Sequence, residues 1–142
     1  MPQITKKPLN LPKNARLRFK FKNFSFFAKI LQTNETKPIL YELLDKLPLR
    51  GYAELWGEEI YFSTPMAILT GGSLDVHVGD VGFWPPGSAL AIFFGKTPAS
   101  EGEKPVPASQ VIVFARIENL KDVLSHLKLV QSADSIVVSL VK

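Results

Sequence analysis

Apolar and polar residues alternate along the first part of the chain. Between residues 14 and 22, apolar side chains occupy every second position and basic side chains occupy the positions between them. Neighbouring side chains of a strand point to opposite faces, so this spacing predicts a half-buried antiparallel strand with one apolar and one cationic face. Residues 24–31 alternate in the same way. A tight turn near Asn23 and an opening hairpin are therefore expected.

Two segments show helical spacing instead of alternation. Apolar residues recur every three or four positions between residues 39 and 47, and again between residues 120 and 127. Pro38 suits the first turn of the earlier helix, where its missing N–H is harmless, and Pro48 ends that helix. Asn119 is placed to cap the later helix. Two isolated helices are predicted, one after the opening hairpin and one before the last strand.

Short apolar and aromatic runs separated by turn residues fill the rest of the chain. Such runs predict strands. A mainly β chain with two isolated helices favours a closed or nearly closed β-barrel whose ends the helices plug, although periodicity alone leaves a sandwich open. The further strands are expected at residues 52–56, 59–63, 74–78, 81–84, 89–94, 110–117 and 136–141.

Length and composition fit one globular domain. The chain has 142 residues, of which 46% are apolar and 21% are charged, and no stretch approaches the roughly 18 apolar residues of a membrane helix. No membrane partner is therefore expected. Residues 1–13 contain three prolines and little periodicity, which predicts a basic, flexible extension before a domain spanning residues 14–142.

The N-terminus and the absence of cysteine indicate a cytoplasmic protein. Lys6 and Lys7 are followed by no apolar core and cleavage site of a secretory signal. Zero cysteines exclude a disulfide framework, a thiolate metal site and a cysteine nucleophile.

Positive charge is concentrated at the start of the chain. Residues 1–34 hold eight Lys or Arg and no acid, whereas the remaining residues hold nine against thirteen acids. Arg16, Arg18, Lys20 and Lys22 form the cationic face of the first strand. This face suits either a solvated surface or contact with nucleic acid, although Phe19 and its apolar neighbours point away from it.

The middle of the chain carries a resemblance to a known family. The segments WGEEIYFSTP (residues 56–65), GDVGFWPPGSALAIFFGKTP (79–98) and VIVFARIENL (111–120) resemble the small prokaryotic cyclophilin-like family of unknown function. A more distant likeness links VIVFARIENL and AIFFG to true cyclophilins. The resemblance implies a cyclophilin-like barrel of about eight strands capped by two helices. It also implies a groove on the barrel wall, with Phe93 or Phe94 near the place where cyclophilins hold a proline ring.

The chain departs from the cyclophilins at their catalytic motifs. It has neither the FHR motif nor the QGGD stretch, and IYFST stands where FHR would be expected. Ser63 and Thr64 can donate hydrogen bonds, but neither supplies the fixed guanidinium that polarises a prolyl amide. Whether the protein is an enzyme stays open on this basis, and the activity to test is prolyl isomerisation.

The leading interpretation is a binding module that holds a small molecule or an extended peptide in an aromatic groove. The same rings could instead belong to the core, with Pro85 and Pro86 as a rigid corner. Peptidyl-prolyl isomerase activity and nucleic-acid association through the basic strand are the alternatives. The residues expected to line the groove are Phe62, Ser63, Phe83, Trp84, Phe93 and Phe94.

The remaining polar residues form no catalytic or metal-binding pattern. His77 and His126 lie in different elements, and no metal site or cofactor is expected. Glu58 and Glu59 follow a Gly57 turn and point to opposite faces, which predicts a solvated turn. Ser63 with His77 and an acid lacks the motif of a hydrolase triad.

Overall fold

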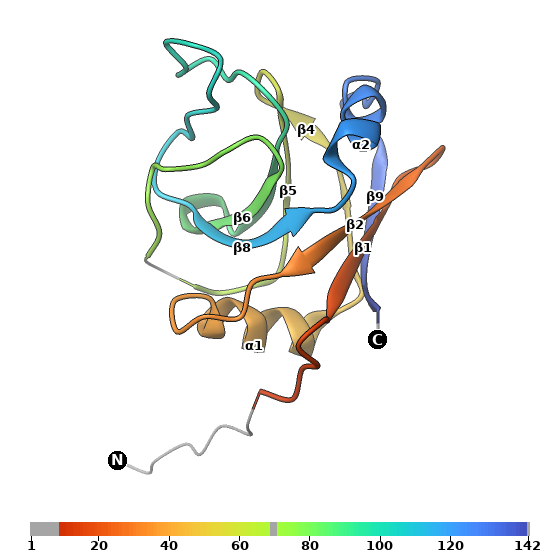
Figure 1. The fold of residues 1–142 in the computed structure, drawn as a ribbon, viewed down its shortest axis with the longest axis vertical. Coiled ribbons are helices and arrows are strands. Elements are labelled where there is room, and N and C mark those ends of the chain that lie inside the picture. Colours follow the sequence, from red (N-terminus) through yellow and green to blue (C-terminus); the bar gives the residue numbers. More distant parts are fainter. Residues whose placement is uncertain (1–8, 69–70, 142) are drawn as a thin grey trace.

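The computed structural model describes residues 9–68 and 71–141 (Figure 1). Within these residues the secondary structure is dominated by strands, as the alternating pattern predicts. The elements are β1 (Arg16–Lys20), β2 (Ser25–Ile30), α1 (Lys37–Lys46), β3 (Leu49–Tyr52), β4 (Glu54–Leu55), β5 (Glu59–Ser63), β6 (Asp80–Trp84), η1 (Pro85–Gly87), β7 (Ala89–Phe93), β8 (Ile112–Ile117), α2 (Leu120–Leu127) and β9 (Ser135–Val141).

The strands form one nearly closed antiparallel barrel. Their order in the sheet is β3-β9-β1-β2-β8-β6-β7-β5-β4. The two edge strands, β3 and β4, are separated along the chain by Ala53 alone, so the backbone itself joins the two edges of the sheet. The predicted mainly β barrel with two helices is confirmed. The described residues form nine strands, against the about eight implied by the resemblance. Where one strand was expected at residues 52–56, the chain is divided at Ala53 and pairs with β9 before it and with β5 after it.

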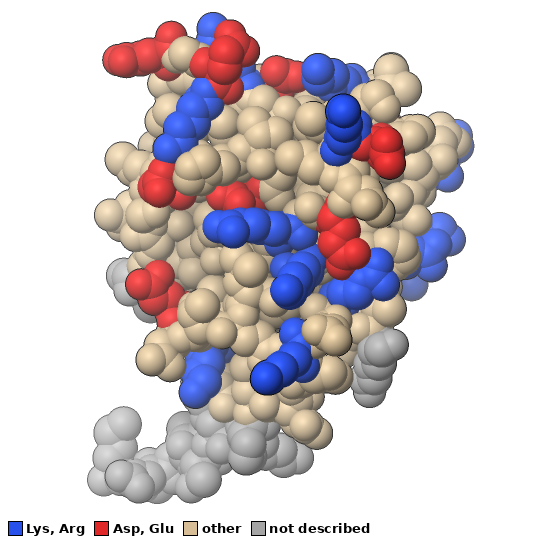
Figure 2. All heavy atoms as spheres, in the orientation of Figure 1, with Lys and Arg blue, Asp and Glu red and all other residues tan. Residues whose placement is uncertain are grey.

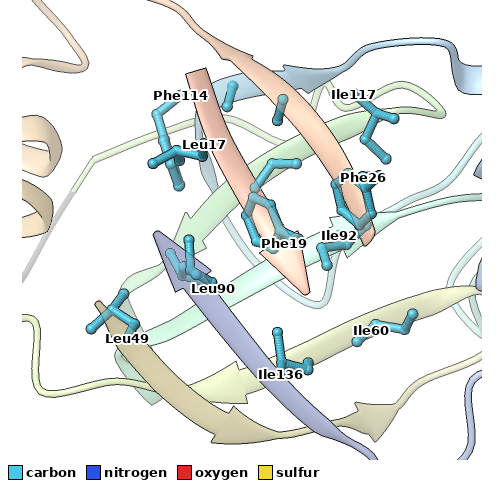
Figure 3. Packing of buried hydrophobic residues seen from close by; sticks show 14 of the residues in the cluster. Leu17, Phe19, Phe26, Leu49, Ile60, Leu90, Ile92, Phe114, Ile117 and Ile136 are labelled. Carbon is cyan, nitrogen blue, oxygen red and sulfur yellow. The ribbon is translucent and has the colours of Figure 1, made fainter. Parts of the chain in front are cut away.

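Side chains from facing strands meet inside the barrel. Figure 3 shows Phe19 of β1 and Phe26 of β2 pointing toward Ile92 of β7, with Leu90 in the same core. The rings of Phe19 and Phe26 are stacked at 4.8 Å between centroids. Large rings make up much of this core. The buried phenylalanines of this core are Phe19, Phe21, Phe26, Phe62, Phe83, Phe94 and Phe114.

The two helices cover opposite ends of the barrel, as Figure 1 shows. Helix α1 buries Ile39, Leu40 and Leu43 in the barrel core, and Pro38 lies in its first turn as predicted. Helix α2 contributes Val123 and Leu127 to the same core. Neither helix, nor any other in residues 9–68 and 71–141, is long and apolar enough to cross a bilayer.

The strand predicted at residues 74–78 is absent from the described structure. Its alternating apolar residues do not share a buried face, because Val76 is buried whereas Leu74 is 55% exposed. The segment is instead held by a turn in which the Asp80 carboxylate accepts a hydrogen bond from the His77 N–H at 2.8 Å. Only one bridge, between Ser73 and Val111, joins this segment to a strand partner within the described ranges.

Part of the predicted N-terminal extension can be placed. Residues 1–8 lie outside the described residues. Leu9 and Leu11 pack against the barrel core, so the last part of the extension is anchored by apolar contact.

Closure of the barrel predicts the effect of a methyl group at Gly51. A Cβ there would lie 2.7 Å from Cδ2 of Phe62, a residue that is 1% exposed and packed in the barrel core. We expect G51A to lower the free energy of unfolding by ~1–3 kcal/mol through overpacking. Urea denaturation of G51A and of G102A, where a Cβ meets nothing within 4 Å, measures the difference. Equal midpoints for the two variants would show that β3 and β5 are not tightly packed at this position.

Candidate functional site

A pocket lies on the outer face of the barrel, where β5, the end of β6 and the segment before β8 meet. It encloses about 130 Å³, and three aromatic side chains and one carboxylate share it. Sites that enclose a whole drug-sized ligand hold about 300–1,000 Å³, so this pocket matches one small headgroup or one side chain. The lining residues are Trp56, Glu59, Tyr61, Trp84, Pro107, Ala108 and Val111.

The hollow follows from the sizes of the outward side chains on three neighbouring strands. Tyr61 of β5 and Gly82 of β6 are both paired with Ala91 of β7, so the three residues form one row across the sheet. In this row, Ala91 and Gly82 carry no large side chain. Tyr61 and Trp84 therefore rise on either side of a low floor, and Val111 lies over Gly82, where a Cβ would meet its Cγ1 at 2.2 Å.

The indole of Trp84 is a fixed wall of the pocket. Its Nε1–H donates a hydrogen bond of 2.6 Å to Oγ of Ser109. Its six-membered ring packs against Gly87, where any Cβ would lie 2.6 Å from the ring. Gly87 belongs to the short η1 turn that follows β6, so the Pro-Pro-Gly corner gives the indole a place to lie. These two contacts hold the indole of Trp84 in one position.

The wall opposite the strands comes from the long segment between β7 and β8. Thr97 is buried, and its hydroxyl donates a hydrogen bond to the carbonyl of Val106. Ser100 donates to the carbonyl of Lys104, and Lys104 forms an ion pair with Asp75. These bonds hold the segment on the outer face of the barrel and place Pro107 in the pocket lining.

Glu59 is the acidic residue of this pocket, and only 8% of its surface is exposed. Burial raises the pKa of its carboxyl from 4.5 to about 7, because a charged carboxylate is poorly solvated there. No hydrogen bond or ion pair to this side chain occurs within residues 9–68 and 71–141. Glu58, on the opposite side of the strand, instead accepts a long hydrogen bond from the Lys96 N–H.

Two carboxylates lie close to Tyr61. Glu54 is its partner across the β4–β5 ladder, and Glu59 precedes it by two positions on the same face. Burial raises the pKa of Tyr61, and the negative charges of Glu54 and Glu59 raise it further. The phenol therefore stays protonated, and the electrostatic potential around it is negative.

The residues expected in an aromatic groove are divided between the two faces of the sheet. Phe62, Phe83 and Phe94 belong to the barrel core. Phe93 is buried on the outer face, in a small cluster with Val76, Ala91 and Val111, and Ser63 is exposed. Among the six, only Trp84 lines the pocket. Adjacent strand residues point to opposite sides, so the pairs Phe62–Ser63, Phe83–Trp84 and Phe93–Phe94 cannot share one surface.

The residues that the sequence did not single out for the site are Trp56, Tyr61, Pro107, Ala108 and Val111. Glu59 was expected in a solvated turn, and its burial corrects that expectation. The alternation of Glu59, Tyr61 and Ser63 against Ile60 and Phe62 was the available signal. It places a carboxylate and a phenol together on the face away from the core.

The cationic face of β1 is partly neutralised. Arg16 donates two hydrogen bonds to the Glu118 carboxylate, at 2.7 and 3.0 Å, and its guanidinium lies 4.2 Å from the ring centre of Phe27. Arg18, Lys20 and Lys22 are exposed. Figure 2 shows basic side chains gathered over β8, β2 and β1, with acidic groups between them. Nucleic-acid binding by this face stays a prediction.

The other polar candidates lie outside the pocket. The Thr64 hydroxyl donates to the carbonyl of Ser88 at 2.7 Å, which ties β5 to the turn before β7. His126 stacks on Phe24 at 5.2 Å between ring centroids, and His77 lies beside Asp75 and Asp80. Within the described ranges, no three His, Asp or Glu residues are grouped as metal ligands would be.

Comparison with known proteins identifies the fold family. A model of the cyclophilin-like family matches residues 15–139. The chain belongs to the cyclophilin-like family. Among solved structures, this cyclophilin-like protein is similar to a hypothetical protein from Archaeoglobus fulgidus, determined in solution, with 36% sequence identity and a TM-score of 0.71. That similarity covers 89% of this chain and 95% of the other. None of the curated proteins is detectably similar in sequence.

Replacement of Glu59 by glutamine is expected to change how stability depends on pH. The folded protein holds the Glu59 proton more tightly than the unfolded chain, so the wild type loses stability as pH rises from about 4.5 to about 7. E59Q lacks this loss. Relative to wild type, the variant should gain roughly 2–3 kcal/mol between pH 4 and pH 8.

Denaturant unfolding of E58Q provides the matched control for this comparison. It removes a carboxylate one residue away that lies outside the pocket lining. A pH-dependent gain of the same size in both variants, or in neither, would contradict the buried state of Glu59.

Proposed function

We propose that this cyclophilin-like protein is a binding module that holds a small organic group in the outer pocket. The observation that carries the proposal is a hollow lined by Trp56, Tyr61 and Trp84, with the indole of Trp84 fixed in place by Ser109. Aromatic walls with a few placed polar groups are typical of sites for small molecules or single side chains. The ligand is either a small molecule or one side chain of an extended peptide.

Binding without prolyl isomerisation is favoured by the residues at the pocket. None of its seven described lining residues is an arginine. Thr64 belongs to the segment IYFST, which stands where the FHR motif would be expected; it lies outside the pocket, and its hydroxyl donates to the carbonyl of Ser88. A developing charge on a prolyl amide would therefore meet no guanidinium at this place.

The tryptophans make the proposal directly measurable. The chain contains two tryptophans, and both line the pocket. Titration with a library of small organic fragments and Xaa-Pro peptides, followed by ¹H–¹⁵N NMR, should shift the two indole N–H signals for every specific binder. W84A should weaken such binders by about tenfold or more, since a ring wall contributes on the order of 1–2 kcal/mol.

Y52A is the matched control, because Tyr52 is an exposed aromatic residue outside the pocket lining. It should leave the affinities unchanged. The same peptides should show no accelerated cis–trans exchange over the slow uncatalysed rate. A library that leaves both indole signals unmoved would refute the binding function, and accelerated exchange would replace it with isomerase activity.

A further inference from the structure

Glu59 is a buried acidic residue whose side chain has no hydrogen-bond or ion-pair partner in the described structure. Its residue is 8% exposed, yet no donor or cation of residues 9–68 and 71–141 contacts its side chain. Among those residues, every side-chain nitrogen or oxygen that is inaccessible to solvent has a hydrogen-bond partner. The oxygens of Glu59 have no partner, so they keep some exposed surface. Since Glu59 lines the pocket, that surface faces the pocket. A buried carboxylate of this kind is stabilised by a cation that enters the site.

The surroundings of Glu59 add negative potential to the same place. The aromatic faces of Trp56, Tyr61 and Trp84 attract cations through their ring quadrupoles. Glu54, across the ladder from Tyr61, adds a negative charge beside the phenol of that residue. On β7 the neighbour of Glu59 is Phe93, which carries no charge. None of the described lining residues is Lys, Arg or His, so no cation of the pocket competes with a ligand.

The shape and the remaining walls restrict the kind of cation. Pro107, Ala108 and Val111 form apolar walls, which cannot replace the water shell of a hydrated inorganic ion. The volume of about 130 Å³ admits a compact group. Alkyl groups on a nitrogen would contact the apolar walls and rings, while the positive charge would face Glu59.

We infer that the outer pocket recognises an organic ammonium group with small alkyl substituents, with Glu59 as its counter-ion and Trp56, Tyr61 and Trp84 as its aromatic walls. This inference rests on the proposed binding function and names the class of its ligand. The group is carried either by a free small molecule or by a methylated lysine side chain.

Choline and its neutral isostere, 3,3-dimethyl-1-butanol, separate charge from shape. The two have nearly the same size, but only choline is positively charged. In titrations followed by the indole N–H signals, wild-type protein should bind choline about tenfold or more tightly than the alcohol, because only the cation is attracted by the aromatic rings and by Glu59. E59Q should remove most of this preference without weakening the alcohol. E58Q should keep the wild-type preference.

The outcomes of this test distinguish the inference from the proposed function. Equal affinities for choline and the alcohol would overturn the cationic ligand while leaving a binding pocket in place. Undetectable choline binding would also overturn it, and the fragment titration would then decide the binding function separately. E59Q should fold like the wild type, because removal of a buried carboxylate without a partner should not lower the free energy of unfolding at neutral pH.

The pH dependence of choline binding tests the role of Glu59 independently. Choline carries a permanent charge, so any change with pH arises from the protein. Affinity should fall as pH is lowered through about 7, where Glu59 takes up its proton, and E59Q should show a flat profile. Neither histidine of the chain, His77 or His126, lines the pocket. An unchanged slope in E59Q would exclude Glu59 as the counter-ion.

Two peptides that differ only in trimethylation of one lysine identify the source of the ammonium group. Tighter binding of the methylated peptide than of free choline would indicate a protein side chain. Equal affinities would indicate that the headgroup alone is recognised.

Discussion

Strict alternation of side chains across β5, β7 and β6 governs both the stability of this protein and its site. The inward positions of these strands hold Ile60, Phe62, Phe83 and Leu90, which fill the barrel. These side chains pack the interior of the barrel, and the pocket lies on the opposite, outer face of the same strands. The outward positions of the same strands carry Glu59, Tyr61 and Trp84, and the pocket forms there because the residue between them on β7 is alanine.

The outer face is built as a second, smaller layer. Val76, Phe93 and Val111 are buried on it, and the segment between β7 and β8 is tied down over them by Thr97 and Ser100. This layer turns a sheet surface into a walled site. It also removes water from Glu59, which raises the pKa of that carboxyl to about 7. The loss of hydration that destabilises the anion in the free protein is what a cationic ligand would offset.

Much of the fold could be predicted from the sequence, because apolar residues recur with a period of two in strands and of about 3.6 in helices. The hairpin at Asn23, both helices and the barrel followed from such patterns and from the family resemblance. The segment from Leu74 to Val78 was the exception. Its alternation resembles a strand, but the carboxylate of Asp80 bonds the His77 N–H and holds a turn, which is a tertiary feature that periodicity does not record.

The site was harder to predict than the fold. Aromatic residues close together in sequence, such as Phe93 and Phe94, were grouped into one groove, but they point to opposite faces. Trp84 is the one residue of the expected groove that lines this pocket. Glu59 was expected in a solvated turn, because a carboxylate beside a glycine usually belongs to one. Its burial depends on Pro107 and Ala108, almost 50 residues away in the chain, and no local pattern links them to it.

The measurement that tests this account most directly is the pKa of Glu59 itself, read from its side-chain carboxyl ¹³C shift during a pH titration with and without choline. The account predicts a value near 7 in the free protein, well above the ordinary 4.5, and a clear decrease when choline is bound. An ordinary value in the free protein, or a value that choline leaves unchanged, would contradict it.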